Sequence, residues 1–80
     1  MSKIRSNGGS SSYYDIPDWA IDIGDLIHHR NMNFNIANIF KACYRLDAKE
    51  GVDAEYDLNK IIFFAQRELE YRSGKRQSRT

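Results

Sequence analysis

Several features that mark familiar classes of protein are missing from these 80 residues. No apolar run approaches the roughly 20 residues that a membrane-spanning helix needs, so we expect no association with a membrane. Lys3 and Arg5 lie near the first residue without an apolar stretch after them, which predicts that there is no signal peptide. The chain also lacks GxxxxGK followed by Ser or Thr, so any phosphate binding cannot be of the P-loop kind.

Cysteine and histidine are scarce as well. The one cysteine, Cys43, cannot form an internal disulfide, and a reducing, cytosolic setting is the default expectation. His28 and His29 are the only histidines, and no cysteine or carboxylate lies at an obvious ligand spacing from them. The sequence therefore predicts no metal site built from these side chains and no catalytic Cys–His pair.

Charge is nearly balanced but unevenly distributed, with 12 Lys and Arg residues against 11 Asp and Glu. Six of the cations lie in residues 1–12 and 72–80, which leaves six cations against all 11 acids in the middle, a net charge of −5. Both ends are poor in large apolar residues, so we expect disordered tails at 1–12 and 74–80 around a folded domain at 13–73. We do not expect nucleic acid as a partner, because the acidic middle would repel phosphate.

Apolar spacing predicts an all-α fold of three helices near residues 17–31, 34–48 and 53–72. We expect Asp15 or Asp18 to cap the start of the first helix. The residues that we expect in the core form one stripe on each helix: Trp19, Ile23, Leu26 and Ile27; Ile36, Phe40 and Cys43; and Leu58, Ile61, Ile62, Ala65 and Leu69.

A second copy of the chain is an expected partner. A folded part of about 60 residues buries only roughly 60% of its surface and tends to be marginal alone. The third predicted helix is apolar over more than half of its circumference around Phe63 and Phe64, which is more than two partner helices can cover. We therefore expect a homodimer or larger assembly that buries Phe63 or Phe64.

Polar residues form a row on each of the last two predicted helices. The rows are Asn38, Lys41 and Arg45 on the second helix, and Asp57, Lys60, Arg67 and Glu68 on the third. Such rows could converge on an anion, with Lys as a point charge, Arg as a two-pronged donor and Asn as a neutral reader. Asp57 would hold Lys60 in place or bind a Mg²⁺ ion that bridges to phosphate. The simpler interpretation, solvated helix faces with ordinary ion pairs, stays open and is favoured by spacing alone.

Four segments between residues 13 and 70 follow one another in a recognisable order: Tyr13-Tyr14, IDIGDLI, NFNIANIFKACYRLDAK and YDLNKIIFFAQREL. In this order they resemble a short phage-encoded family of nucleotide kinase-like proteins, many of them of unknown function. The family's His is Tyr13 here, and its Gly after the Arg is Asp47. The resemblance therefore supports a helical fold with a basic polar site better than it supports an enzyme. It implies a phage origin and action in the cytoplasm of an infected bacterium.

The predicted function is that of a phage accessory protein which binds a nucleotide or nucleotide-like phosphate ligand, with Mg²⁺ as a potential companion. The predicted binding residues are Asn38, Lys41, Arg45, Lys60 and Arg67. Sequestration and phosphoryl transfer both stay open, although transfer needs a closed site that so short a chain could build only across subunits. The alternative is a non-enzymatic interaction module that binds and inhibits a host protein such as a defence component, which the aromatic pair Phe63-Phe64 favours.

Overall fold

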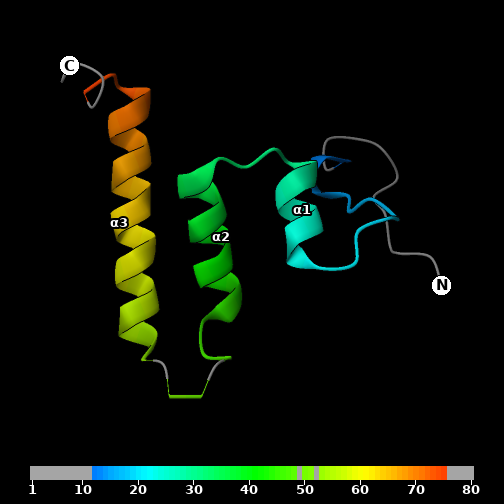
Figure 1. The fold of residues 1–80 in the computed structure, drawn as a ribbon, viewed down its shortest axis with the longest axis horizontal. Coiled ribbons are helices and arrows are strands. Elements are labelled where there is room, and N and C mark those ends of the chain that lie inside the picture. Colours follow the sequence, from blue (N-terminus) through cyan, green and yellow to red (C-terminus); the bar gives the residue numbers. More distant parts are fainter. Residues whose placement is uncertain (1–11, 49, 52, 76–80) are drawn as a thin grey trace. The chain divides into compact units, whose positions relative to one another are not determined.

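The computed structural model describes residues 12–48, 50–51 and 53–75. The elements are the 3-10 helix η1 (Ser12–Tyr14) and the α-helices α1 (Ile23–His29), α2 (Phe34–Arg45) and α3 (Ala54–Arg72), which Figure 1 shows in order along the chain. The described residues contain three α-helices and no strand, which confirms the all-α prediction. None of these helices has the length and hydropathy to cross a membrane. The predicted tails lie almost wholly outside the described residues.

The chain divides into two compact units between Asn31 and Met32. Helix α1, in the first unit, is much shorter than the predicted helix at 17–31. It begins where Asp22 and Asp25 cap each other: Asp22 Oδ1 accepts the Asp25 N–H at 3.0 Å, and Asp25 Oδ2 accepts the Asp22 N–H at 3.3 Å. The predicted start was wrong because the reciprocal cap of Asp22 and Asp25 begins the helix. The earlier acidic residues Asp15 and Asp18 do not cap it.

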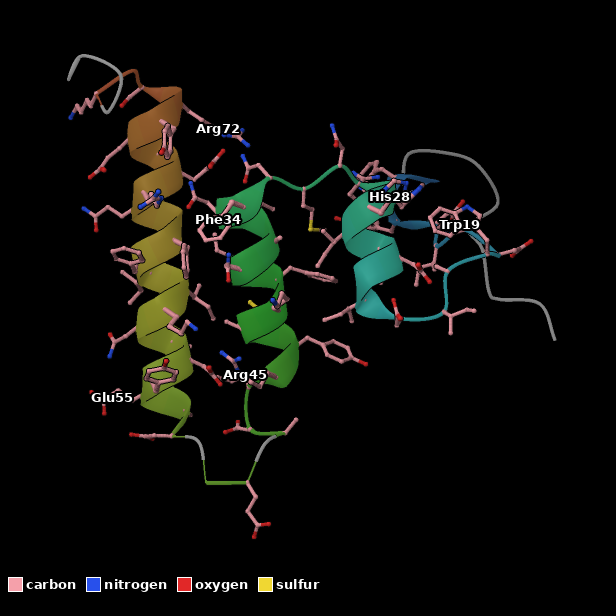
Figure 2. All side chains as sticks on the ribbon, viewed as in Figure 1. Trp19, His28, Phe34, Arg45, Glu55 and Arg72 are labelled. Atoms are coloured by element: carbon pink, nitrogen blue, oxygen red, sulfur yellow. The ribbon has the colours of Figure 1, made fainter. Side chains whose placement is uncertain are left out.

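Trp19 does not join a core in the first unit. Its side chain is 52% exposed, and its ring meets the rings of His28 and His29 edge-on, with centroids 6.3 and 6.0 Å apart (Figure 2). Both histidines lie in the last turn of α1 and are exposed. The prediction that Trp19 packs in the core was therefore wrong, because its aromatic neighbours are surface residues.

Helices α2 and α3 form an antiparallel hairpin in the second unit (Figure 1). α2 begins after Asn33, whose Oδ1 accepts a backbone N–H at 2.9 Å, and α3 begins after Asp53, whose side chain does the same at 3.3 Å. The predicted bounds of 53–72 hold for α3, whereas the predicted 34–48 overruns α2. α2 ends early because Asp47 adopts φ of +63°, a left-handed conformation that terminates helices.

The surface between α2 and α3 buries polar side chains. Asn35 is 4% exposed, Asp57 1% and Glu68 7%, and Ala42 is buried as well at 1%. Several residues that were predicted for the core lie exposed instead: Cys43, Leu58, Ile62 and Leu69. The helices meet on the face of Ala42 and Asp57, and not on the predicted face one residue further along, which holds Cys43 and Leu58. A step of one residue turns a helix by about 100°, which carries the predicted face away from the contact.

Candidate ligand-binding site

The end of the hairpin next to the α2–α3 connection is held by an ion pair. Arg45, in the last turn of α2, donates from Nε and Nη2 to Asp57 Oδ1 at 3.0 and 2.5 Å. The Asp57 side chain is 1% exposed and lies in the first turn of α3, where the helix dipole favours a negative charge. The hydrogen bond to Asp57 raises the pKa of Arg45 above its ordinary value. The pair joins the two helices and occupies Nε and Nη2 of Arg45.

This pairing also decides what Asp57 can hold. Mg²⁺ binds carboxylate oxygens that are open to the ion and to its waters. Asp57 is buried, and its Oδ1 already accepts two hydrogen bonds from Arg45, so the residue does not fit a magnesium site. It does not steady Lys60 through any described contact; the Lys60 ammonium lies 5.4 Å from the centre of the Tyr56 ring instead. No group of three or more His, Cys, Asp or Glu side chains suited to a metal occurs in the described part of the chain.

The opposite end of the hairpin is tied by one carboxylate that accepts from three donors. Glu68 accepts from Asn35 Nδ2 at 3.0 Å, from Asn33 Nδ2 at 2.9 Å and from Arg72 Nε at 2.7 Å. The hydrogen bond from Asn35, followed by those from Arg72 and Asn33, lowers the pKa of Glu68 from 4.5 to about 2. Glu68 is therefore charged at neutral pH and acts as a fixed acceptor, which makes it a poor proton carrier.

An open pocket of about 330 Å³ lies beside this network. It is lined by Asn33, Phe34, Asn35, Arg67, Glu68 and Tyr71. Phe34 extends from the first turn of α2 toward α3 (Figure 2), and its side chain is 67% exposed. The Arg67 guanidinium lies 5.6 Å from the centre of the Tyr71 ring. Aromatic and cationic walls next to amide groups suit a planar polar ligand.

Two buried atoms at this pocket have no hydrogen-bond partner among the described residues: Asn35 Oδ1 and Arg67 Nε. The first is an acceptor and the second a donor. A buried polar atom without a partner costs about 1–3 kcal/mol, and folded proteins satisfy nearly all such atoms. The bond from Asn35 Nδ2 to Glu68 fixes the orientation of the Asn35 amide, so its oxygen cannot turn away to find another donor. One acceptor and one donor among the residues that line the pocket are thus left without a partner in the described part of the chain.

The two sides of the hairpin differ in character. Four buried positions mark where the helices meet: Asn35, Ala42, Asp57 and Glu68. Each is preceded by an aromatic or cationic residue: Phe34, Lys41, Tyr56 and Arg67. Each is followed by an apolar residue: Ile36, Cys43, Leu58 and Leu69. Because the helices are right-handed and antiparallel, the preceding residues of both helices lie on one side of the hairpin and the following residues on the other. We call these the aromatic–cationic side and the apolar side.

The predicted binding residues all lie toward the aromatic–cationic side, but Arg67 is the one among them that lines the pocket. Arg67 lines the pocket, whereas Arg45 is engaged by Asp57. Asn38 Nδ2 donates to the Phe34 carbonyl at 2.8 Å, within its own helix. Lys41 is exposed.

Sequence reasoning missed the two asparagines and Tyr71. The sequence held a weak signal for the asparagines. Asn33 and Asn35 both stand at the predicted start of a helix, where capping uses one side chain, so the second amide is left for another role. The two aromatic residues predicted for an interface differ in exposure: Phe63 is 55% exposed, whereas Phe64 is half-buried. The Phe64 ring packs edge-on against the rings of Phe34 and Phe63, with centroids 5.7 and 5.1 Å apart. Burial of either ring by a second chain stays a prediction.

No family model, no curated protein and no solved structure matches this chain. The resemblance to the phage-encoded family therefore stays a prediction. A function has to be inferred from the pocket and its surroundings.

Proposed function

We propose that this protein binds a nucleotide, with the base in the pocket between Phe34, Arg67 and Tyr71. The observation that carries the proposal is the unpaired couple Asn35 Oδ1 and Arg67 Nε. An adenine or cytosine edge offers an exocyclic amine next to a ring nitrogen, one donor and one acceptor, which are the two kinds of partner that these atoms lack. The exposed Phe34 ring adds a stacking surface, and base–aromatic stacking contributes about 1–3 kcal/mol per base.

Cations on the same side of the hairpin suit the phosphates. Lys41 stands seven residues after Phe34, about 10 Å along the axis of α2. Lys60 comes from α3 on the aromatic–cationic side, with its ammonium over the Tyr56 ring. A nucleotide whose base fills the pocket could extend its phosphates along this side toward the two lysines. Of the residues predicted from the sequence, Arg67, Lys41 and Lys60 keep a binding role in this proposal, and Arg45 does not.

The proposal is one of binding and not of phosphoryl transfer. The pocket is open, and transfer needs a site that excludes water and holds the reacting groups in line. Glu68 is the carboxylate among the lining residues, and its three hydrogen bonds and low pKa suit it to hold the site together. Sequestration of a nucleotide or a nucleotide signal is the activity that this arrangement supports best.

Titration calorimetry with AMP, ATP and CMP, and with inorganic tripolyphosphate as the phosphate-only ligand, tests the proposal. We expect a nucleotide to bind, and Arg67→Lys, which keeps the charge but loses Nε, to weaken it at least about tenfold. Phe34→Ala should also weaken binding through lost stacking. Tyr44→Ala is the matched control, because Tyr44 is an α2 aromatic of similar exposure, 69% against 67%, that lies away from the pocket.

Two results would contradict this function. One is the absence of heat and of thermal stabilisation with every nucleotide, since a ligand that binds only the native state must raise its stability. The other is an affinity that Arg67→Lys and Phe34→Ala leave unchanged. Either result would bring forward the alternative prediction of a module that inhibits a host protein.

A further inference from the structure

The apolar side of the hairpin carries a stripe on α3 that nothing in the described second unit covers. Leu58 is 47% exposed, Ile62 59% and Leu69 68%, with half-buried Ala65 between the last two. Their separations of four, three and four residues are those of the a and d positions of a coiled coil. A stripe of this spacing is typical of a helix that packs along another helix.

The charges at the two ends of this stripe decide what kind of helix fits it. Continuing the same spacing outward by three residues at each end reaches Glu55 and Arg72, which Figure 2 shows at opposite ends of α3. The stripe is therefore acidic at its start, apolar in its middle and basic at its end. Glu55 is exposed, and the Arg72 side chain is 69% exposed although its Nε is bonded to Glu68.

A second copy of α3 complements this pattern in the antiparallel direction. Leu58 then lies opposite Leu69 of the second copy, and Ile62 lies opposite the small Ala65. In the same register Glu55 lies opposite Arg72 at both ends. A parallel pairing would place Glu55 against Glu55 and Arg72 against Arg72, which like-charge repulsion disfavours.

We propose that two copies of this chain associate through an antiparallel contact between their α3 helices, centred on Ile62 and Ala65. The outer flank of the contact consists of Asn59 and Gln66, which face each other across the two copies and carry no charge that would oppose pairing. The contact leaves the aromatic–cationic side free, so dimerisation and ligand binding do not compete. It differs from the predicted burial of Phe63 or Phe64.

The mass of the full chain in solution, measured by light scattering over a concentration series without nucleotide, tests the association. The expected mass at high concentration is twice the 9.3 kDa of the chain. Ile62→Lys should leave a monomer at concentrations where the natural chain is dimeric. Phe63→Lys is the matched control, because Phe63 is 55% exposed against 59% for Ile62 but lies on the other side of α3. Both positions are exposed, so circular dichroism should show that both variants keep their helices.

Cross-linking tests the direction. In a Cys43→Ala background, a mixture of Asn59→Cys and Gln66→Cys chains should form a disulfide-linked dimer, whereas either variant alone should not. A cross-link of each variant with itself would show a parallel pair and overturn the register. A mass of 9.3 kDa at every concentration would overturn the dimer and leave the stripe to a different partner. Loss of the dimer in Phe63→Lys but not in Ile62→Lys would move the contact to the other side.

Discussion

The two ends of the α2–α3 hairpin both join the helices through a buried carboxylate, but they differ in what they leave unpaired. At one end Asp57 and Arg45 face each other as a single ion pair. At the other end Glu68 accepts from three donors, while the neighbouring atoms Asn35 Oδ1 and Arg67 Nε keep no partner among the described residues. The first end is complete as it stands. The second has two unpaired polar atoms in residues that line a pocket, which is the basis of the proposed binding site.

Charge at both ends also fixes how the helices align. Sliding α2 along α3 by one turn would separate Arg45 from Asp57 and Asn35 from Glu68 together. A buried ion pair adds little net stability compared with apolar residues of the same shape, but breaking one is expensive because a buried charge is left alone. The hairpin thus has a strongly defined register even though its interface buries few apolar side chains.

The largest expected effect is at the complete end. Arg45→Ala should lower the melting temperature by on the order of 10 °C, because it leaves the Asp57 carboxylate buried without its partner. Arg72→Ala, at the other end, should cost much less, since Glu68 keeps its bonds from Asn33 and Asn35. Thermal unfolding followed by circular dichroism measures both changes.

A double variant provides the control for this prediction. Arg45→Met combined with Asp57→Leu removes both charges and should recover most of the loss, as apolar replacement of buried ion pairs does elsewhere. Equal melting temperatures for Arg45→Ala and the natural chain would mean that the pair does not join the helices. The proposed difference between the two ends of the hairpin would then be wrong.

The second effect is a pH dependence at the other end. The pKa of Glu68 is lowered from 4.5 to about 2 in the folded state, so its contribution to stability is fully present above pH 5 and is lost as the pH falls toward 2. Glu68→Gln should be less stable than the natural chain at pH 7, and the difference should shrink steadily below pH 5. Urea unfolding at pH 7, 5, 4 and 3 measures it.

Glu50→Gln is the control for this titration, because Glu50 is an exposed acid outside both the Asn33–Asn35–Glu68–Arg72 network and the proposed contact between α3 helices. It should retain the natural decline in stability between pH 5 and pH 3. A stability difference between Glu68→Gln and the natural chain that stays constant over this range would show that the Glu68 carboxylate is not held by its three donors.

The start of a helix could be predicted from the sequence where a capping residue directly precedes it. Asp53 was the predicted cap of the third helix, and Asn33 or Asn35 that of the second; α2 begins right after Asn33 and α3 right after Asp53. The start of α1 could not be chosen among several acidic residues, because the reciprocal bond between Asp22 and Asp25 depends on backbone geometry that a list of caps does not contain.

The buried face of each helix was the harder question. Apolar spacing assigned Leu58 and Ile62 to the core, but α2 and α3 meet on the neighbouring face, where Arg45 and Asp57 pair. Spacing within one helix cannot reveal a pairing between two helices. The same limit applies to the pocket: Arg67 stood out as a cation, whereas the role of Asn35 follows from a carbonyl oxygen left unpaired beside α3.

A third substitution separates binding from stability at the end with spare capacity. Arg67→Met removes the unpaired buried Nε, which should raise stability, and the contact of the guanidinium with the Tyr71 ring, which should lower it. Because the two effects oppose each other, the free energy of unfolding should shift by no more than about 1 kcal/mol. Nucleotide binding should be lost in the same variant. Calorimetry and urea unfolding on one sample measure both quantities, and a large destabilisation would place Arg67 with the structural residues.

The smallest expected effect on stability is that of Lys41→Ala. Lys41 belongs to the same predicted row as Arg45, but it is exposed, so its removal should change the free energy of unfolding by less than about 0.5 kcal/mol. If Lys41 meets phosphate, the variant should bind ATP several-fold more weakly at low salt and bind the unphosphorylated nucleoside as the natural chain does. The loss for ATP should fade above about 0.5 M salt, because an exposed charge is screened there. An equal loss for nucleoside and nucleotide would mean that Lys41 shapes the pocket and does not contact phosphate, and the proposed path of the phosphates along the aromatic–cationic side would be wrong.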